Sequence, residues 1–192
     1  AREDATETCD SIPSLKRTMK KKEKFGGVGF GYGDVALSDD KLRYAAKDIQ
    51  NQFDMGKTCL KTVISFDEEF LREHGIIDDD FTCKRKGDYR GHIDQMKLRY
   101  AIMNGLDKMS RNYDNLQYIG VIQVDTMHVH CHLCMVDKGR GNLTKDGTQR
   151  GKLLPNDKKL LRRGIDTYLD QKQQVKMMAS SVSYDKRNAV CY

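Results

Sequence analysis

The segment VDTMHVHCHLCMVDKG, residues 124–139, carries three of the chain's five histidines at alternate positions. In a β-strand, successive side chains point to opposite faces. A strand over 129–136 would therefore have one apolar face that packs against helices, made of Val129, Cys131, Leu133 and Met135. The opposite face would carry His128, His130, His132 and Cys134.

A single histidine on a strand is most often a hydrogen-bonded structural residue, but a row of imidazoles on one face needs another explanation. Adjacent imidazoles can bind one divalent cation, and their closeness disfavours protonation of both rings. Asp125, just before the strand, could accept the second ring N–H of a ligand histidine and fix its tautomer. The histidine row therefore predicts a metal site.

Cys131 and Cys134 raise a different hypothesis, in which a Cys-x-x-Cys pair holds a structural zinc ion. Their odd separation turns the two thiols to opposite faces of an extended strand, and the sequence contains no second Cys-x-x-Cys. Zinc binding would require this segment to be a turn. The chain would then be a non-catalytic, zinc-stabilised nucleic-acid-binding protein.

On either side of the histidines the sequence predicts strands and helices. Residues 116–124 (LQYIGVIQV) predict a strand antiparallel to 129–136, because only a short turn separates the two. Residues 59–66 (CLKTVISF) predict another strand. Helices are expected over 38–52, 67–73, 92–110 and 155–178. The fold class is therefore α+β, with a central antiparallel sheet and helices packed on it, as one domain over 1–192.

The helix over 92–110 has apolar residues at helical spacing, which predicts that a single stripe faces the core. Its members are Ile93, Met96, Tyr100, Met103 and Leu106.

The first 37 residues are expected to form a basic and glycine-rich arm or a set of loops. Six of the nine residues from Lys16 to Lys24 are basic, and FGGVGFGYGD (25–34) follows them. A dinucleotide-binding loop would need a strand before these glycines, whereas a lysine-rich run precedes them. We therefore expect a mobile loop or hairpin, with a phosphate-accepting backbone surface as the alternative.

Composition limits the class of protein. The net charge of +6 favours polyanionic partners, and basic residues gather at 16–24 and 158–163. No apolar run approaches the length of a membrane span and no signal peptide opens the chain, so a cytoplasmic protein is expected. The six cysteines follow no regular framework, which indicates reduced thiols.

The phrase QVDTMHVHCHLCMVDKG (123–139) resembles the third motif of the HUH endonucleases. It is more similar to the relaxase form of that motif, H-x-D-x-x-x-P-H-x-H, with Asp125, His130 and His132 in register. Gln123 stands where that pattern has its first histidine, and Val129 where it has proline. The order of REDAT, ISFDEEF (64–70), the histidine motif and TKDGTQRGKL (144–153) is similar to the MobL group of conjugative plasmid relaxases from Gram-positive bacteria.

The resemblance implies an RRM- or ferredoxin-like HUH relaxase core that binds Mg²⁺ or Mn²⁺. His130 and His132 would be ligands, with Gln123 or His128 as the third. The reaction would be a site- and strand-specific transesterification, in which a tyrosine attacks one DNA phosphodiester to start plasmid mobilisation.

The resemblance also predicts that the tyrosine lies upstream of Ala1. Tyr168 lies where rolling-circle replication initiators of the HUH class have their nucleophile, which keeps that function as an alternative. Tyr32 is a weaker candidate.

The expected partners are single-stranded origin-of-transfer DNA and accessory relaxosome proteins. Basic side chains on the arm, on the connection after the histidine strand and on the following helix are predicted to contact phosphates. They are Lys20, Lys21, Lys22, Arg150, Lys152, Arg162 and Arg163.

Overall fold

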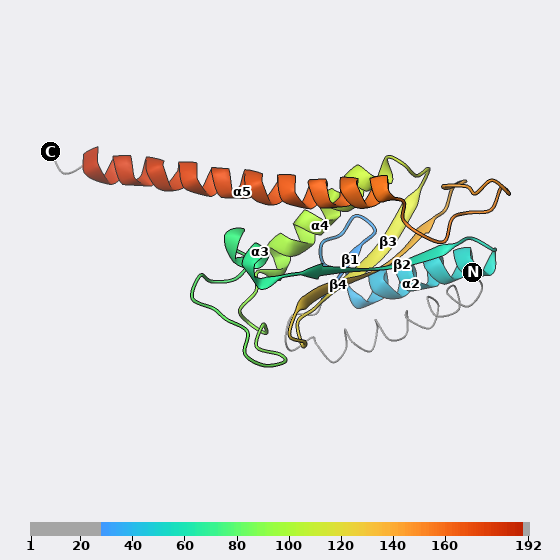
Figure 1. Ribbon diagram of the computed structural model, residues 1–192, viewed down its shortest axis with the longest axis horizontal. Helices are drawn as coiled ribbons and strands as arrows, with labels where there is room; N and C mark the ends of the chain where they lie inside the picture. Colours follow the sequence, from blue (N-terminus) through green and yellow to red (C-terminus); the bar gives the residue numbers. More distant parts are fainter. Residues whose placement is uncertain (1–27, 190–192) are drawn as a thin grey trace.

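The computed structural model describes residues 28–189, with side chains described as far as Gln171 and at Val175. Its centre is a four-stranded antiparallel sheet in the order β1-β3-β4-β2 (Figure 1). The strands are β1 (Gly29–Gly31), β2 (Cys59–Phe66), β3 (Leu116–Gln123) and β4 (Val129–Asp137). The predicted α+β class and the antiparallel pairing of β3 with β4 are confirmed.

In the described part of the chain, four helices surround the sheet, and Figure 1 labels them α2 to α5. They are α2 (Asp39–Asp54), α3 (Glu68–Glu73), α4 (Gln95–Ser110) and α5 (Pro155–Ala189). The side chains of Ser38, Asp67 and Asp94 cap the first three by accepting hydrogen bonds from backbone N–H groups of the first turn. Helix α5 continues past the expected end near 178, because no glycine or proline interrupts 165–189.

Helices cover both faces of the sheet, so the core has two parts. The larger part joins α3, α4 and α5 to the face that carries Val129, Cys131 and Leu133. The smaller part lies under α2, which packs on Cys134 and Val136 of the other face. Helix α2 covers only the Cys134 end of that second face.

The prediction of which face of α4 packs against the core is wrong. Met96 and Tyr100 are 51% and 42% exposed, whereas Leu98, Ile102 and Met109 are fully buried. Ile93 and Met103 are only partly buried, and of the five predicted residues Leu106 alone is in the core. Single apolar side chains such as Met96 are common on protein surfaces, and Tyr100 can keep its hydroxyl in water, so their spacing misled the prediction.

Of the two expectations for the glycine-rich segment, the mobile loop needs correction, because Gly29–Gly31 form the edge strand β1 and a tight turn bridges Gly31 to Asp34 in a hairpin-like arrangement. Phe30 is fully buried in the larger core. Gly31 has φ of 133°, and a Cβ atom there would lie 2.0 Å from the carbonyl oxygen of Tyr118. Glycine at this position allows close approach of the neighbouring strand rather than chain mobility.

The side chain of Gln149 holds the polar connection between β4 and α5 in place. Gln149 Oε1 accepts from the backbone N–H of Thr58 at 2.9 Å, and its Nε2 lies 3.1–3.3 Å from the carbonyl oxygens of Asp137, Gly139 and Arg140. These contacts hold the connection beside the start of β2.

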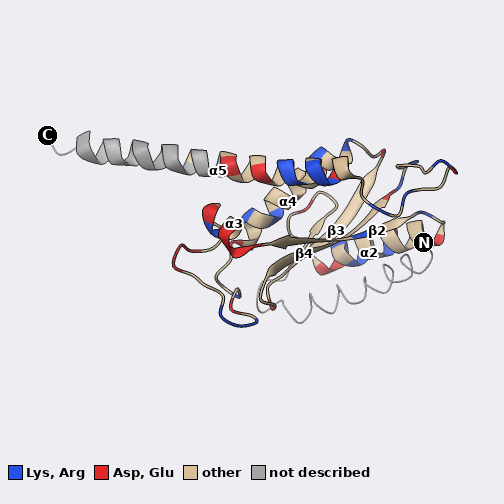
Figure 2. Ribbon diagram, in the orientation of Figure 1, with Lys and Arg blue, Asp and Glu red and all other residues tan. Residues whose placement is uncertain are grey.

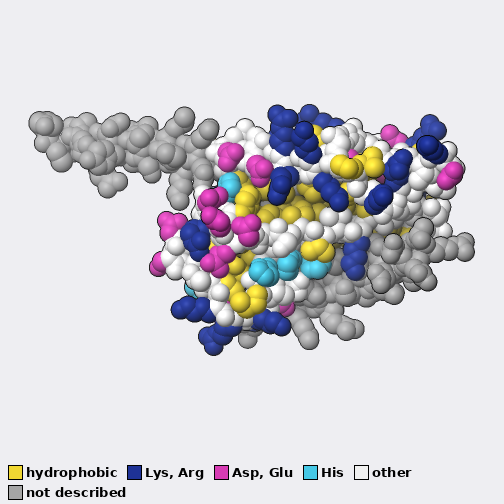
Figure 3. Space-filling model, viewed as in Figure 1, with side chains coloured by type: hydrophobic (Ala, Val, Ile, Leu, Met, Phe, Trp, Pro, Cys, Tyr) yellow, Lys and Arg dark blue, Asp and Glu magenta, His cyan; other side chains and the backbone are white. Residues whose placement is uncertain are grey.

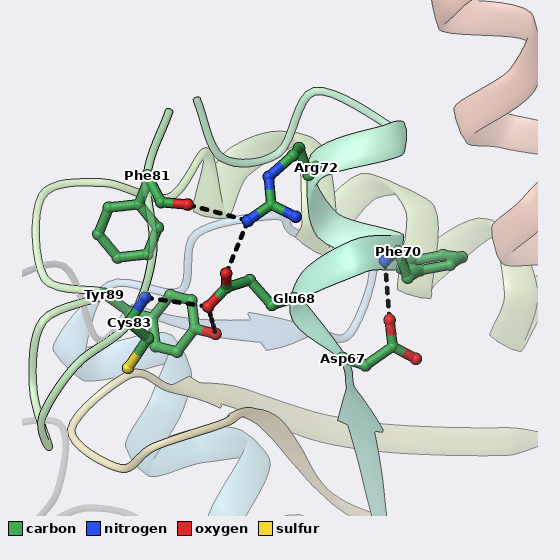
Figure 4. A network of polar contacts seen from close by, with 7 residues as sticks. All are labelled: Asp67, Glu68, Phe70, Arg72, Phe81, Cys83 and Tyr89. Carbon is green, nitrogen blue, oxygen red and sulfur yellow. Dashed lines mark hydrogen bonds and ion pairs between the residues drawn. The ribbon is translucent and has the colours of Figure 1, made fainter. Parts of the chain in front are cut away.

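A second polar network holds the loop between α3 and α4 (Figure 4). Glu68 accepts from the backbone N–H of Cys83 at 2.9 Å and from Arg72 at 2.6 Å. Arg72 also donates to the carbonyl oxygen of Phe81. The hydrogen bond from Cys83 and the Arg72 cation keep the pKa of Glu68 below its ordinary value.

Candidate metal and DNA-binding site

The histidines lie at the end of the second sheet face that none of the described helices covers. On β4, His130 and His132 share a face with Cys134 and Val136, but α2 buries only the latter two. Gln123 on β3 pairs with His130, and Ser65 and Val63 on β2 pair with His130 and His132. Directly paired residues of antiparallel strands point to the same face. The result is a partly open polar shelf formed by three neighbouring strands.

Gln123, His130 and His132 meet on this shelf. Gln123 Oε1 lies 2.7 Å from His132 Nε2. The rings of His130 and His132 are edge to face, with their centroids 6.5 Å apart. His130 Nδ1 is buried and has no hydrogen-bond partner in the structure. A buried ring nitrogen without a partner is unfavourable unless it gains a proton acceptor or a cation.

The remaining two predicted metal-site residues, His128 and Asp125, lie in the turn before β4. His128 is exposed, and its ring centroid is 6.2 Å from that of His130. The Thr126 hydroxyl donates to the His128 carbonyl oxygen, which ties the turn together. Asp125 is partly buried and makes no hydrogen bond to His130 Nδ1.

The donor set suits a hard or borderline divalent cation. Two imidazole rings and one amide oxygen share the same face of the sheet, and the buried His130 Nδ1 without a partner also favours a cation here. Among the described residues, no group of three His, Cys, Asp or Glu side chains is placed to hold a metal ion. A site here would therefore depend on the glutamine.

The two cysteines of the zinc hypothesis lie on opposite sides of the sheet, as their spacing predicts. Cys131 belongs to the larger core and Cys134 to the smaller one, and both are 1% exposed or less. Burial raises the pKa of the Cys131 thiol. This arrangement cannot bring both sulfur atoms to one zinc ion.

The two tyrosine candidates are held in structural contacts. The Tyr32 hydroxyl donates to Asp48 at 2.7 Å, and burial together with this carboxylate raises its pKa. Tyr168 stacks on Tyr100 with ring centroids 6.4 Å apart, and burial raises its pKa as well. A raised pKa opposes formation of the phenolate that attacks phosphorus.

A groove of about 980 Å³ lies beside the shelf, between β2 and α5. Its floor is apolar and includes Ile64, Leu161 and Ile165. Figure 3 shows this hollow next to the histidine row, with basic side chains along one side. The basic residues that line it are Lys61, Lys152, Lys158 and Arg162.

The structure brings together only some of the predicted phosphate contacts. Lys152 and Arg162 line the groove, whereas Arg150 and Arg163 do not. Arg163 is exposed on the basic first turns of α5 (Figure 2), and Arg150 is half-buried. Lys20, Lys21 and Lys22 lie outside the described residues.

Sequence reasoning missed Lys61 and Lys158 as groove residues. Lys61 is an exposed residue on a strand otherwise rich in β-formers, and that alternation could have indicated an edge strand. Lys158 belongs to the basic cluster at the start of α5. Its place in the groove depends on how α5 packs.

Comparisons with known proteins agree with the motif. The family model for MobL relaxases matches residues 7–192, which is nearly the whole chain. No curated protein and no solved structure gives a significant match. None of the described helices has both the length and the apolar composition needed to cross a bilayer. The match over almost the full length shows that this chain belongs to the MobL family of relaxases.

Proposed function

We propose that this chain is the nuclease domain of a metal-dependent relaxase, which nicks one strand of origin-of-transfer DNA through a tyrosine. Membership of the MobL family supports DNA nicking and binding of origin-of-transfer DNA, and relaxases generally use a divalent metal ion. The single observation that carries the finer proposal is the meeting of Gln123, His130 and His132 on the open end of the sheet.

His130 and His132 would be the imidazole ligands, and Gln123 would be the third. We favour Gln123 over His128 because its amide oxygen already lies 2.7 Å from His132 Nε2, whereas His128 is exposed outside the strand. When bound, Mg²⁺ or Mn²⁺ would polarise the scissile phosphate and stabilise charge on its oxygens.

The protein's own part in the reaction is to orient these groups. Adjacent strands fix Gln123 opposite His130, so the donors are positioned by the sheet ladder rather than by a loop. Asp125 would accept the second ring N–H of a ligand histidine. Which tyrosine attacks the DNA stays a prediction from the resemblance.

Substrate binding would use the groove beside the shelf. Lys152 and Arg162 would bind phosphates next to the scissile one, with Lys61 and Lys158 beside them. Arg163, Arg150 and the lysines at 20–22 remain candidate contacts elsewhere on the DNA. Accessory relaxosome proteins and a cytoplasmic location remain part of the proposal.

Metal titration tests the ligand set without requiring the origin sequence. We expect about one Mn²⁺ per chain by isothermal titration calorimetry, with binding lost in His130→Ala and His132→Ala. Gln123→Ala should weaken binding by about 10- to 100-fold. His92→Ala is the matched control, because His92 stacks on Phe81 in the loop between α3 and α4 and does not belong to the histidine strand.

The same variants test catalysis in a DNA-nicking assay. Both histidine variants should lose metal-dependent nicking of their own origin DNA and retain most of their DNA affinity, since the basic groove is unchanged. Cleavage retained in both, or Mn²⁺ binding that survives in both, would reject the assignment.

The replication-initiator alternative has its own test. It needs Tyr168 as the nucleophile, and the stacking of Tyr168 on Tyr100 argues against that role. Tyr168→Phe should leave nicking intact.

A further inference from the structure

The outer side of β2 lacks a strand partner among the residues that the structure describes. In the described sheet, β2 is an edge strand and its one partner is β4. Val63, at the middle of β2, is 50% exposed, and Lys61 and Ser65 are exposed on either side of it. An uncovered edge of this kind can pair with another strand through its backbone N–H and C=O groups.

The groove beside this edge has charges of opposite sign at its two ends. Helix α5 runs in the same direction as β2. Gln149, in the connection that leads into α5, accepts a hydrogen bond from Thr58 at the start of β2. Further along α5, Asp170 lies 3.5 Å from His74, which follows the other end of β2. The basic end contains Lys61, Lys152, Lys158 and Arg162, and the acidic end contains Asp67, Asp166 and Asp170. Figure 3 shows the acidic side chains gathered at one end of the hollow and the basic ones along its remainder.

We propose that a second copy of this chain pairs with this edge, strand β2 against strand β2, about a two-fold axis through the middle of the strand. Antiparallel pairing lays the first half of each strand beside the second half of the other. The basic end of each groove then faces the acidic end of the other groove, and both contacts form at once. The two sheets become one continuous sheet, and the apolar floors meet between the two α5 helices.

The charge pattern favours a second copy over a nucleic acid as the occupant of the whole groove. A DNA strand is uniformly negative, so the end with Asp67, Asp166 and Asp170 would repel it. A parallel pair of β2 strands would place like charges side by side. Only the antiparallel two-fold arrangement matches every charged end with its opposite.

This pairing has a consequence that rests on the proposed function. It would cover Lys152 and Arg162, which are proposed DNA contacts. The paired form would therefore be a DNA-free state, and single-stranded DNA would compete with the second copy.

Analytical ultracentrifugation across protein concentration tests the pairing. We expect the wild-type chain to pass from monomer to dimer as concentration rises, and the dimer to weaken with added salt. Lys158→Glu with Arg162→Glu should raise the dimer dissociation constant about tenfold or more, and Asp166→Lys with Asp170→Lys should do the same. Reversing all four charges restores opposite signs across the axis and should restore the dimer.

Two controls separate pairing from damage to the fold. Arg43→Glu with Lys47→Glu makes the same charge change on α2, away from the groove, and should leave the dimer intact. Circular dichroism should match wild type in each variant. Hydrogen exchange at the amides of 59–66 should slow as the dimer forms.

A chain that is monomeric at every concentration overturns the proposal, as does a dimer that ignores both reversals or that leaves exchange in 59–66 unchanged. Failure here would leave the proposed function standing, because Mn²⁺ titration of the histidine variants reports on residues that no groove variant changes.

Discussion

Helices α4 and α5 cross where Gly105 contacts Gly164, and this close crossing predicts that Gly164→Ala destabilises the fold. A Cβ atom on Gly164 would lie 2.4 Å from the Cα of Gly105 and 3.0 Å from the carbonyl oxygen of Asn104. Ordinary van der Waals contact begins near 3.4 Å, and the atoms in the way are backbone. Gly164→Ala must therefore push α5 away from α4 by about 1 Å.

The magnitude follows from what α5 buries. Leu161, Ile165 and Leu169 are 6% exposed or less, and full burial of such a side chain contributes about 2 kcal/mol. A gap of about 1 Å loses roughly a quarter to a half of the dispersion contact. The loss is then about 1.5 to 3 kcal/mol, which the better helix propensity of alanine offsets by about 1 kcal/mol. We expect a net destabilisation of about 0.5 to 2 kcal/mol and a Tm lower by about 1 to 8 °C.

Urea denaturation followed by circular dichroism would measure this change, with Gly151→Ala as the matched control. A Cβ on Gly151 meets nothing closer than Thr58 at 4.0 Å, so that variant should lose no stability. If Gly164→Ala proved as stable as wild type, or more stable as helix propensity alone requires, the packing argument would be wrong.

Two further predictions concern charge. Folding lowers the pKa of Glu68 below its ordinary value of 4.5. The ionised carboxylate therefore contributes its full stabilisation of the fold above pH 4.5, and this contribution is lost as the pH falls through the pKa of Glu68 in the folded protein. Glu68→Gln should therefore flatten the fall in unfolding free energy on acidification below 4.5, and an unchanged slope by urea titration would refute this. Replacing Lys152 and Arg162 by glutamine should reduce the slope of log affinity for single-stranded DNA against log salt by about 1.4, while Lys47→Gln leaves it unchanged. Fluorescence anisotropy across salt concentrations would measure the slopes, and equal slopes in all three proteins would remove these residues from the DNA interface.

Much of the sheet could be predicted from sequence because its strands are short runs of β-formers between polar turns. The predicted bounds of β2 agree with the structure, and those of β3 and β4 differ by one residue at one end. The alternation of His130 and His132 with Cys131 and Leu133 fixed which side chains share a face. That pattern is local, so tertiary packing did not alter it.

Two features could not be predicted from the local sequence pattern, because both depend on tertiary packing. They are the choice of which face of α4 is buried and the presence of the groove. Arg99 is 5% exposed although arginine is rarely buried, whereas Met96 is half exposed. Lys61 lines a groove only because β2 is at the sheet edge and α5 returns beside it. Gln123 was a candidate by resemblance, and its place beside His132 required the register of β3 against β4.

Gln149 holds the base of the connection after β4, and the tip of that connection extends beyond its hydrogen bonds. Residues 145–148 are exposed, and a local turn closes them through hydrogen bonds between Thr144 and Thr148. The tip lies beyond the Asp137 end of β4, roughly 20 Å along the strand from His130 at 3.3 Å per residue. A fluorophore or a short affinity tag introduced there would report on arriving oligonucleotides by energy transfer without touching the histidines.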